Sequence, residues 1–141
     1  MKRIAISCAL AIAAIASAQA ADAAKVKVTP LATLDKTVTG QNVEFPKDAH
    51  ALVFLAEFPP GARLPEHKHP YPHFVYVLEG TLTVVNTETG KTFTVKQGDV
   101  LAEMMNTWHY GINKTALPVK LLVIDEVPPG VTTNTIPREA K

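Results

Sequence analysis

Hydrophobic and polar residues alternate along two short segments in the middle of the chain. Residues 81–84 and 91–95 place an apolar side chain at every second position, as half-buried β-strands do. The inner face of these strands would be formed by Leu82, Val84, Phe93 and Val95. The five residues between them, 86–90, end in glycine and predict a hairpin loop. The pattern therefore predicts an antiparallel strand pair.

Similar short runs, rich in Val, Thr, Phe, Leu and Tyr, continue along the chain between Gly, Asn and 11 prolines. No window shows a helical period of useful length. The candidate strands are 26–28, 33–38, 51–58, 73–79, 81–86, 91–96, 100–104, 108–112 and 118–126. Many short strands separated by turn residues predict an all-β sandwich or barrel.

Two runs, 51–56 and 119–124, are apolar on both faces. Such strands need a covering layer on each side. A second subunit or the N-terminal segment of the same chain would provide it, and the sequence leaves both open. We expect a homodimer, because symmetric pairing is the commonest form of association.

The first twenty residues have the anatomy of a secretory signal peptide. Lys2 and Arg3 precede an apolar stretch over 4–15, and residues 18–20 form an Ala-x-Ala cleavage site. The apolar stretch is shorter than the roughly 20 residues of a membrane-spanning helix. We therefore expect cleavage after Ala20 and an exported protein, either periplasmic or secreted.

This cleavage would define the domain organisation as a signal peptide over 1–20, a linker over 21–29 and one domain over 30–141. The only cysteine, Cys8, would be removed, so no disulfide is expected. No second apolar segment is long enough to anchor the chain in a membrane.

Charge and composition exclude two further classes of protein. The chain has 14 Lys and Arg against 13 Asp and Glu, which gives no basic surface for nucleic acid. It is 47% hydrophobic and 19% charged, which argues against intrinsic disorder. A small molecule is thus the expected partner.

Four of the five histidines are spaced as metal ligands would be. His67 and His69 lie two positions apart, and in an extended segment both side chains share one face. His73 follows beyond two prolines, and His109 lies 36 positions further on. Neutral imidazole is a common ligand for Zn, Cu, Fe and Ni. The spacing favours a metal site, whereas His50 stands in a predicted polar turn and is left out of it.

The same residues resemble the two sequence motifs of the cupin superfamily. Residues 61–80 are similar to the first motif, G-x5-H-x-H-x3-E-x6-G, with His73 at the position that usually holds Glu. Residues 98–113 are similar to the second motif, G-x5-P-x-G-x2-H-x3-N, with Met104 and Asn106 in place of its Pro and Gly. The matched positions are Gly61, His67, His69, Gly80, Gly98, His109 and Asn113.

This resemblance implies a cupin jelly-roll barrel of two antiparallel sheets, with its core over about 50–127. It also implies one divalent metal ion inside, held by His67, His69, His73 and His109. The ion would be Mn, Fe, Cu, Ni or Zn, and the resemblance does not choose among them. Four neutral ligands would leave its full charge to attract an anionic substrate. With His73 turned away, a three-histidine site would remain.

Other side chains near the motifs are weaker candidates. Arg63 and Lys68 flank the paired histidines and would suit an anionic substrate. Glu57 and Glu103 would serve as general bases or accept hydrogen bonds from imidazole. A pocket lining is an alternative to core packing for Phe74, Tyr76, Met104, Met105 and Trp108. Asn113 is expected to shape a turn.

Three functions are compatible with such a site. The leading one is an exported, metal-dependent oxygenase of the dioxygenase type, acting on a small anionic or enolisable organic substrate. The second is a Lewis-acid isomerase, lyase or sugar-modifying enzyme. The third is a binding module for a metal or ligand without catalysis, because fold does not decide function.

Overall fold

The computed structural model describes residues 25–139, in which nine strands and no helix are present. The predicted signal peptide lies outside these residues. No helix within them is long and apolar enough to cross a membrane. The strands are β1 (His50–Phe58), β2 (His67–Lys68), β3 (His73–Glu79), β4 (Thr81–Asn86), β5 (Thr92–Lys96), β6 (Val100–Ala102), β7 (His109–Ile112), β8 (Val119–Val127) and β9 (Ile136–Pro137).

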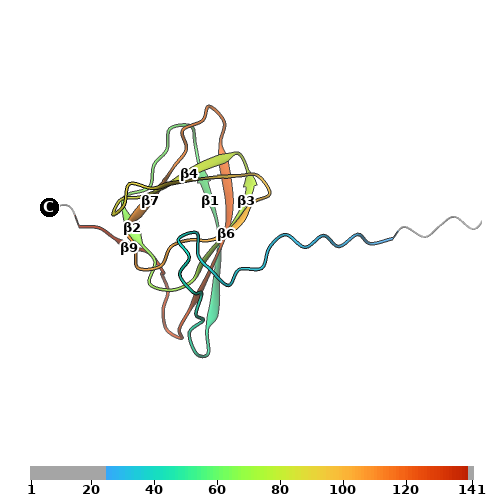
Figure 1. Cartoon of the computed structure of the whole chain (residues 1–141), viewed down its shortest axis with the longest axis vertical. Helices are drawn as coiled ribbons and strands as arrows, with labels where there is room; N and C mark the ends of the chain where they lie inside the picture. The colour runs from blue at the N-terminus through green and yellow to red at the C-terminus, as the bar shows by residue number, and fades with distance from the viewer. Residues whose placement is uncertain (1–24, 140–141) are drawn as a thin grey trace, which may run out of the picture.

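The strands form two antiparallel sheets that face each other, as Figure 1 shows. One sheet has the order β1-β8-β3-β6 and the other the order β5-β4-β7-β2-β9. The apolar core lies between them and includes Val75, Val77, Val84, Val119 and Leu121. The all-β prediction with two antiparallel sheets is therefore confirmed.

The alternating pattern of the central hairpin is also confirmed. Leu82 pairs with Val95 and Val84 with Phe93 across β4 and β5. Leu82, Val84 and Val95 are buried, and Phe93 packs half-buried against the core. The threonines on the other face of the hairpin are half-buried (Thr81 and Thr83) or exposed (Thr92 and Thr94). The hairpin therefore has one face towards the core and one towards solvent, as antiparallel sheets commonly do.

The two strands that are apolar on both faces receive unequal cover. On β8, Val119, Leu121 and Val123 point into the core, and the residues between them are half-buried. On β1, Val53 and Leu55 on the outer face are 60% and 58% exposed. The N-terminal segment covers this sheet only in part, through Phe45, whose ring stacks on Phe74 at a centroid distance of 6.0 Å. The outer face of β1 is left open by the described residues.

The predicted strands at 26–28 and 33–38 are wrong. Residues 25–35 form no strand, and only an isolated bridge joins Lys36 to Asn42. Val26 and Val28 are 91% and 83% exposed, because this segment runs away from the barrel (blue in Figure 1) and meets no partner strand. His50 is not in a turn but begins β1. The two-residue strands β2 and β9 were not expected, since they are too short to give a pattern.

Gly80 and Asn113 support the barrel rather than the metal site. Gly80 has a φ of +80°, and a Cβ there would lie 2.5 Å from the carbonyl oxygen of Pro118. The turn between β3 and β4 therefore needs glycine. The side-chain amide of Asn113 donates to the carbonyls of Phe58 and Leu117. This buried amide holds the turn that was expected of it.

Candidate metal centre

Strand register brings the four predicted histidines together. On one sheet, β2 pairs with β7 so that His67 lies directly opposite His109. On the other sheet, β3 begins at His73, which pairs with Asp125 of β8. Residues directly opposite in an antiparallel pair bring their Cβ atoms within roughly 5.5 Å. His69 follows His67 on the same face, so both sheets contribute to one cluster.

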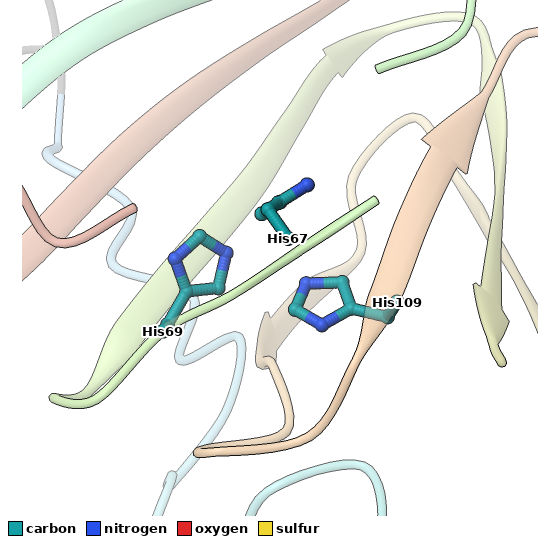
Figure 2. Close-up of side chains that lie close together, drawn as sticks. All are labelled: His67, His69 and His109. Carbon is teal, nitrogen blue, oxygen red and sulfur yellow. The ribbon is translucent and has the colours of Figure 1, made fainter. Parts of the chain in front are cut away.

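The four imidazoles are buried and in close contact. The ring centroids of His67 and His69 are 4.9 Å apart, and those of His67 and His109 are 4.6 Å apart. Figure 2 shows the rings of His67, His69 and His109 around a shared space. The ring of His73 stacks on that of His69 at 3.8 Å. His50, which was left out of the predicted site, is exposed at the start of β1.

Each of the four Nδ1 atoms lies within hydrogen-bond distance of a protein oxygen. His67 and His109 bond to the carbonyls two residues before them, at Pro65 (2.7 Å) and Thr107 (2.8 Å). His69 bonds to the carbonyl of Asn134 at 3.0 Å. These acceptors favour the tautomer with the proton on Nδ1, which leaves the lone pair on Nε2. Imidazoles that bind metals have this second hydrogen bond in nearly all cases.

His73 is held by a buried carboxylate. Its Nδ1 lies 2.6 Å from Oδ1 of Asp125, which also accepts a hydrogen bond from the side-chain amide of Asn134 at 2.8 Å. Burial alone would raise the pKa of Asp125, but the bond from His73 and the amide of Asn134 lower it below its usual value. Asp125 therefore stays ionised and fixes the orientation of the ring.

A fifth group, the carboxylate of Glu103, lies among the Nε2 atoms. Glu103 directly follows β6 and is buried. Its Oε2 is 3.0 Å from Nε2 of His109, 3.5 Å from that of His69 and 3.9 Å from that of His73. The cluster thus contains a carboxylate although His73 replaces the Glu of the first motif.

Burial keeps two of the imidazoles neutral. It lowers the pKa of His67 to about 4, with only partial compensation from the Pro65 carbonyl. It also lowers the pKa of His69, an effect that the neighbouring His73 strengthens. Both rings therefore offer a free lone pair at neutral pH, as metal ligation requires.

Glu103 and His109 form a charged pair. Burial would raise the pKa of Glu103, but its contacts with His109, His69 and His73 hold that pKa well below the usual range. Burial would lower the pKa of His109, yet the hydrogen bond that its Nε2 donates to Glu103 raises that pKa above the usual value. His109 consequently has an oxygen acceptor at each ring nitrogen and can hold a second proton, which a metal ion would have to displace.

The residues fit a divalent transition metal. Two overlapping sets have ligand atoms within 4.8 Å of one another: His67, His69 and His109, and His69, His73 and Glu103. Nε2 of His69 is the one buried side-chain nitrogen or oxygen in residues 25–139 without a hydrogen-bond partner. A buried polar group without a partner destabilises the folded state by about 1–3 kcal/mol, and a cation bound to this nitrogen would remove that penalty. Imidazole with one carboxylate suits Mn, Fe, Cu, Ni or Zn.

A cavity of about 260 Å³ adjoins the cluster. Its polar wall consists of His67, His69, His73 and Glu103, and its remaining wall is almost entirely apolar. The site therefore has room for a small molecule beside the side chains that could hold the metal.

The other candidate residues lie away from this cavity. The guanidinium of Arg63 lies over the ring of Tyr110 at 3.7 Å, and Nζ of Lys68 lies over Trp108 at 4.9 Å. Glu57 pairs with Lys120 on the surface. The cavity lining does not include Phe74, Tyr76, Met104, Met105 or Trp108. Met104 packs in the core, and Phe74 stacks under Phe45.

Asp125 and Asn134 were missed by the sequence analysis, and Glu103 was only one of two carboxylates considered. For Glu103 and Asp125 a signal existed, because Glu103 lies within the apolar run 100–105 and Asp125 directly follows the apolar run 121–124. A buried charge of this kind is costly unless it is paired. Asn134 gave no signal, since it lies in an irregular segment far along the chain from His69.

The chain belongs to the cupin domain family, whose model matches residues 54–125, about half of its length. That range contains all four clustered histidines, Glu103 and Asp125. No curated protein matches the chain.

Solved structures of several enzymes resemble it. A cupin-superfamily sugar phosphate isomerase from Silicibacter pomeroyi is 29% identical, with a TM-score of 0.49 over 56% of this chain and 52% of the isomerase. The polyketide cyclase RemF from Streptomyces resistomycificus is 24% identical, with a TM-score of 0.50 over 62% of each chain. Oxalate decarboxylase from Lactobacillus farciminis is 24% identical, with a TM-score of 0.52 over 62% of this chain and 26% of the decarboxylase. The match spans less than two thirds of each of these proteins. The cyclase and the decarboxylase share the fold with this chain.

We expect His67→Ala, His69→Ala and His109→Ala to lose bound metal, because each removes one Nε2 from the cluster. The loss of affinity should exceed the roughly 10–100-fold typical of changes to groups that only orient a ligand. The loss of metal affinity in Asp125→Asn should stay within that smaller range, and His73→Glu should retain metal. Elemental analysis of purified variants, alongside their thermal unfolding without metal, provides the measurement. Unchanged metal content in the three Ala variants would show that the histidines are structural, and His50→Ala is the matched control.

Metal affinity should fall as pH decreases through the raised pKa of His109. Below that pKa each bound ion must displace one proton from the imidazole, whereas His67 competes for protons only near pH 4. Glu103→Gln removes the charge that raises the pKa of His109, so the fall in metal affinity should shift to lower pH. Calorimetric titration with zinc in two buffers of different ionisation enthalpy counts the released protons. An identical pH dependence in both proteins would contradict this explanation.

Proposed function

We propose that this protein is a mononuclear metal enzyme, an oxygenase of the dioxygenase type, that acts on a small anionic or enolisable organic substrate. The observation that carries the proposal is a cluster of His67, His69, His73, His109 and Glu103 beside an apolar cavity. A divalent transition metal held there would supply Lewis acidity and, if redox-active, would react with oxygen.

The cavity lining favours oxygenation over the Lewis-acid alternative. Moving a proton between two substrate atoms requires positioned acid and base groups. Among the described residues that line the cavity, the titratable groups are His67, His69, His73 and Glu103, which lie together in one cluster. A sugar would also need hydrogen-bond partners along its length, and the rest of the wall offers one hydroxyl, at Thr135. Addition of oxygen needs fewer such groups, and apolar walls suit an apolar gas.

Glu103 supports catalysis over simple binding. Its carboxylate is ionised and faces the cavity beside the Nε2 atoms. In that position it can accept the proton of an enol or phenol hydroxyl as the substrate oxygen approaches the cluster. A protein that only stores a metal would need neither this base nor the adjoining cavity.

Oxygen consumption by reconstituted protein tests the proposal. The metal-free protein is loaded in turn with Fe, Mn, Cu or Zn and offered phenolic and diketone compounds in an oxygen electrode. We expect uptake with a redox-active metal, none with zinc, and none with His109→Ala. Turnover with zinc in the absence of oxygen would instead establish the Lewis-acid function. Tight metal binding without any turnover would support the binding module.

A second copy of the chain is the partner that we propose for the free edge of β1. This nine-residue strand ends the sheet of order β1-β8-β3-β6 and contains no proline or lysine. Its outer face carries Val53 and Leu55, both more than half exposed. A long apolar edge strand is prone to pair with another strand, and antiparallel pairing of two β1 strands would be symmetric.

Replacement of both exposed residues should disrupt this dimer. We expect Val53→Lys with Leu55→Lys to give a monomer, because lysines on an edge strand oppose strand pairing. Leu117→Lys, at an apolar position that is 69% exposed in a loop, is the control and should remain dimeric. Sedimentation at micromolar concentration measures the mass. A wild-type protein that sediments only as a monomer would refute the proposal.

We also propose export to the periplasm or the exterior. This rests only on residues 1–20, whose basic, apolar and small-residue regions follow the order of a signal peptide. The mass of the protein recovered from its native compartment would identify the N-terminus.

A further inference from the structure

The cavity beside the metal centre separates polar from apolar surface sharply. Its titratable groups, His67, His69, His73 and Glu103, lie together in the histidine cluster, and Thr135 adds one hydroxyl. The remaining walls come mainly from β1, β3, β4 and β8 and carry Phe54, Ala56, Val75, Leu82, Leu121 and Val123. A ligand that fills this space must therefore place its polar head at the histidines and its body against hydrocarbon.

No lysine or arginine within residues 25–139 lines the cavity. The two cations nearest the paired histidines in sequence, Arg63 and Lys68, lie over the rings of Tyr110 and Trp108. Arg138 binds the carboxylate of Glu66 at 2.6 Å. A phosphate or a second carboxylate on the ligand body would thus be buried without a countercharge, which is strongly unfavourable.

The volume limits the size of the body. At about 260 Å³ the cavity lies just below the roughly 300–1,000 Å³ of ordinary ligand pockets. A single ring with a small head is of the right order. Phe54 lines the cavity and is 43% exposed, so its ring forms part of the apolar wall and is not buried in the core.

The geometry of the cluster selects the head. The two overlapping sets of ligand atoms lie within 4.8 Å of one another and share His69, whose buried Nε2 has no hydrogen-bond partner. Because these atoms lie together, only one part of a ligand can reach a metal ion held there. That part would be an oxygen group able to bind the ion.

We infer that the site takes a molecule with one metal-binding oxygen head and an apolar body about one ring in size, and that it excludes phosphorylated, sugar-like or dicarboxylate ligands. This inference rests on the proposed metal site and deepens it. Phe54 is assigned to the recognition of the apolar body.

Three hydroxamates that share one metal-binding head test the inference without turnover. The zinc-loaded protein is titrated calorimetrically with acetohydroxamate, benzohydroxamate and succinic monohydroxamate. Benzohydroxamate should bind at least about tenfold more tightly than acetohydroxamate, because each additional buried carbon contributes severalfold. Succinic monohydroxamate should bind most weakly, because its distal carboxylate meets no cation.

Phe54→Ser, with Leu117→Ser as its control, tests the assignment of Phe54. Phe54→Ser should reduce the advantage of benzohydroxamate and leave acetohydroxamate binding unchanged. Leu117→Ser, at an exposed apolar position in a loop outside the cavity lining, should change neither. Equal affinities for the three ligands, or a preference for the carboxylate-bearing one, would overturn the inference while leaving the metal site intact. Zinc that fails to bind the wild-type protein, measured by elemental analysis, would overturn the proposed function and this inference together.

Discussion

The arrangement of the candidate site depends on four hydrogen bonds that occupy the Nδ1 atoms of its histidines. The acceptors are the carbonyls of Pro65, Thr107 and Asn134 and the carboxylate of Asp125. With the Nδ1 proton donated in this way, each ring presents Nε2 to the interior. These acceptors come from β8 and from the segments that precede β2, β7 and β9. The fold thus fixes ring orientation as well as position, which reduces the reorganisation needed to bind a ligand.

Glu103 gives this cluster its electrostatic character. Buried imidazoles resist protonation, and the ionised Asp125 lies on the Nδ1 side of His73. The carboxylate at 3.0 Å from Nε2 of His109 supplies one negative charge inside the barrel. It raises the pKa of that histidine and is itself kept ionised. Glu103 also makes a site of three histidines and one carboxylate possible, although the first motif has His73 at the position that usually holds Glu.

Local patterns predicted much of the fold and the four histidines. Alternation identified the hairpin of β4 and β5, and the two-residue spacing of His67 and His69 placed both on one face. The strand predicted at 33–38 is absent, because the β-strand preference of its residues does not provide a neighbouring strand to pair with. Asp125 and Asn134 reach the site through pairing over long sequence distances, which no single segment encodes. The position of Glu103 among the imidazoles likewise depends on how the two sheets face each other.

The central claim is that one metal ion binds within this cluster of imidazoles and the Glu103 carboxylate. X-ray absorption spectroscopy of the metal-loaded protein, compared with Glu103→Gln and His73→Ala, tests it most directly because it reports the ligands around the ion. Zinc–nitrogen distances lie at about 2.0–2.1 Å. We predict an imidazole-dominated shell of four nitrogens that loses one in His73→Ala and loses its carboxylate oxygen in Glu103→Gln. A shell of oxygens alone, unchanged in both variants, would show that the metal binds elsewhere and would contradict the account.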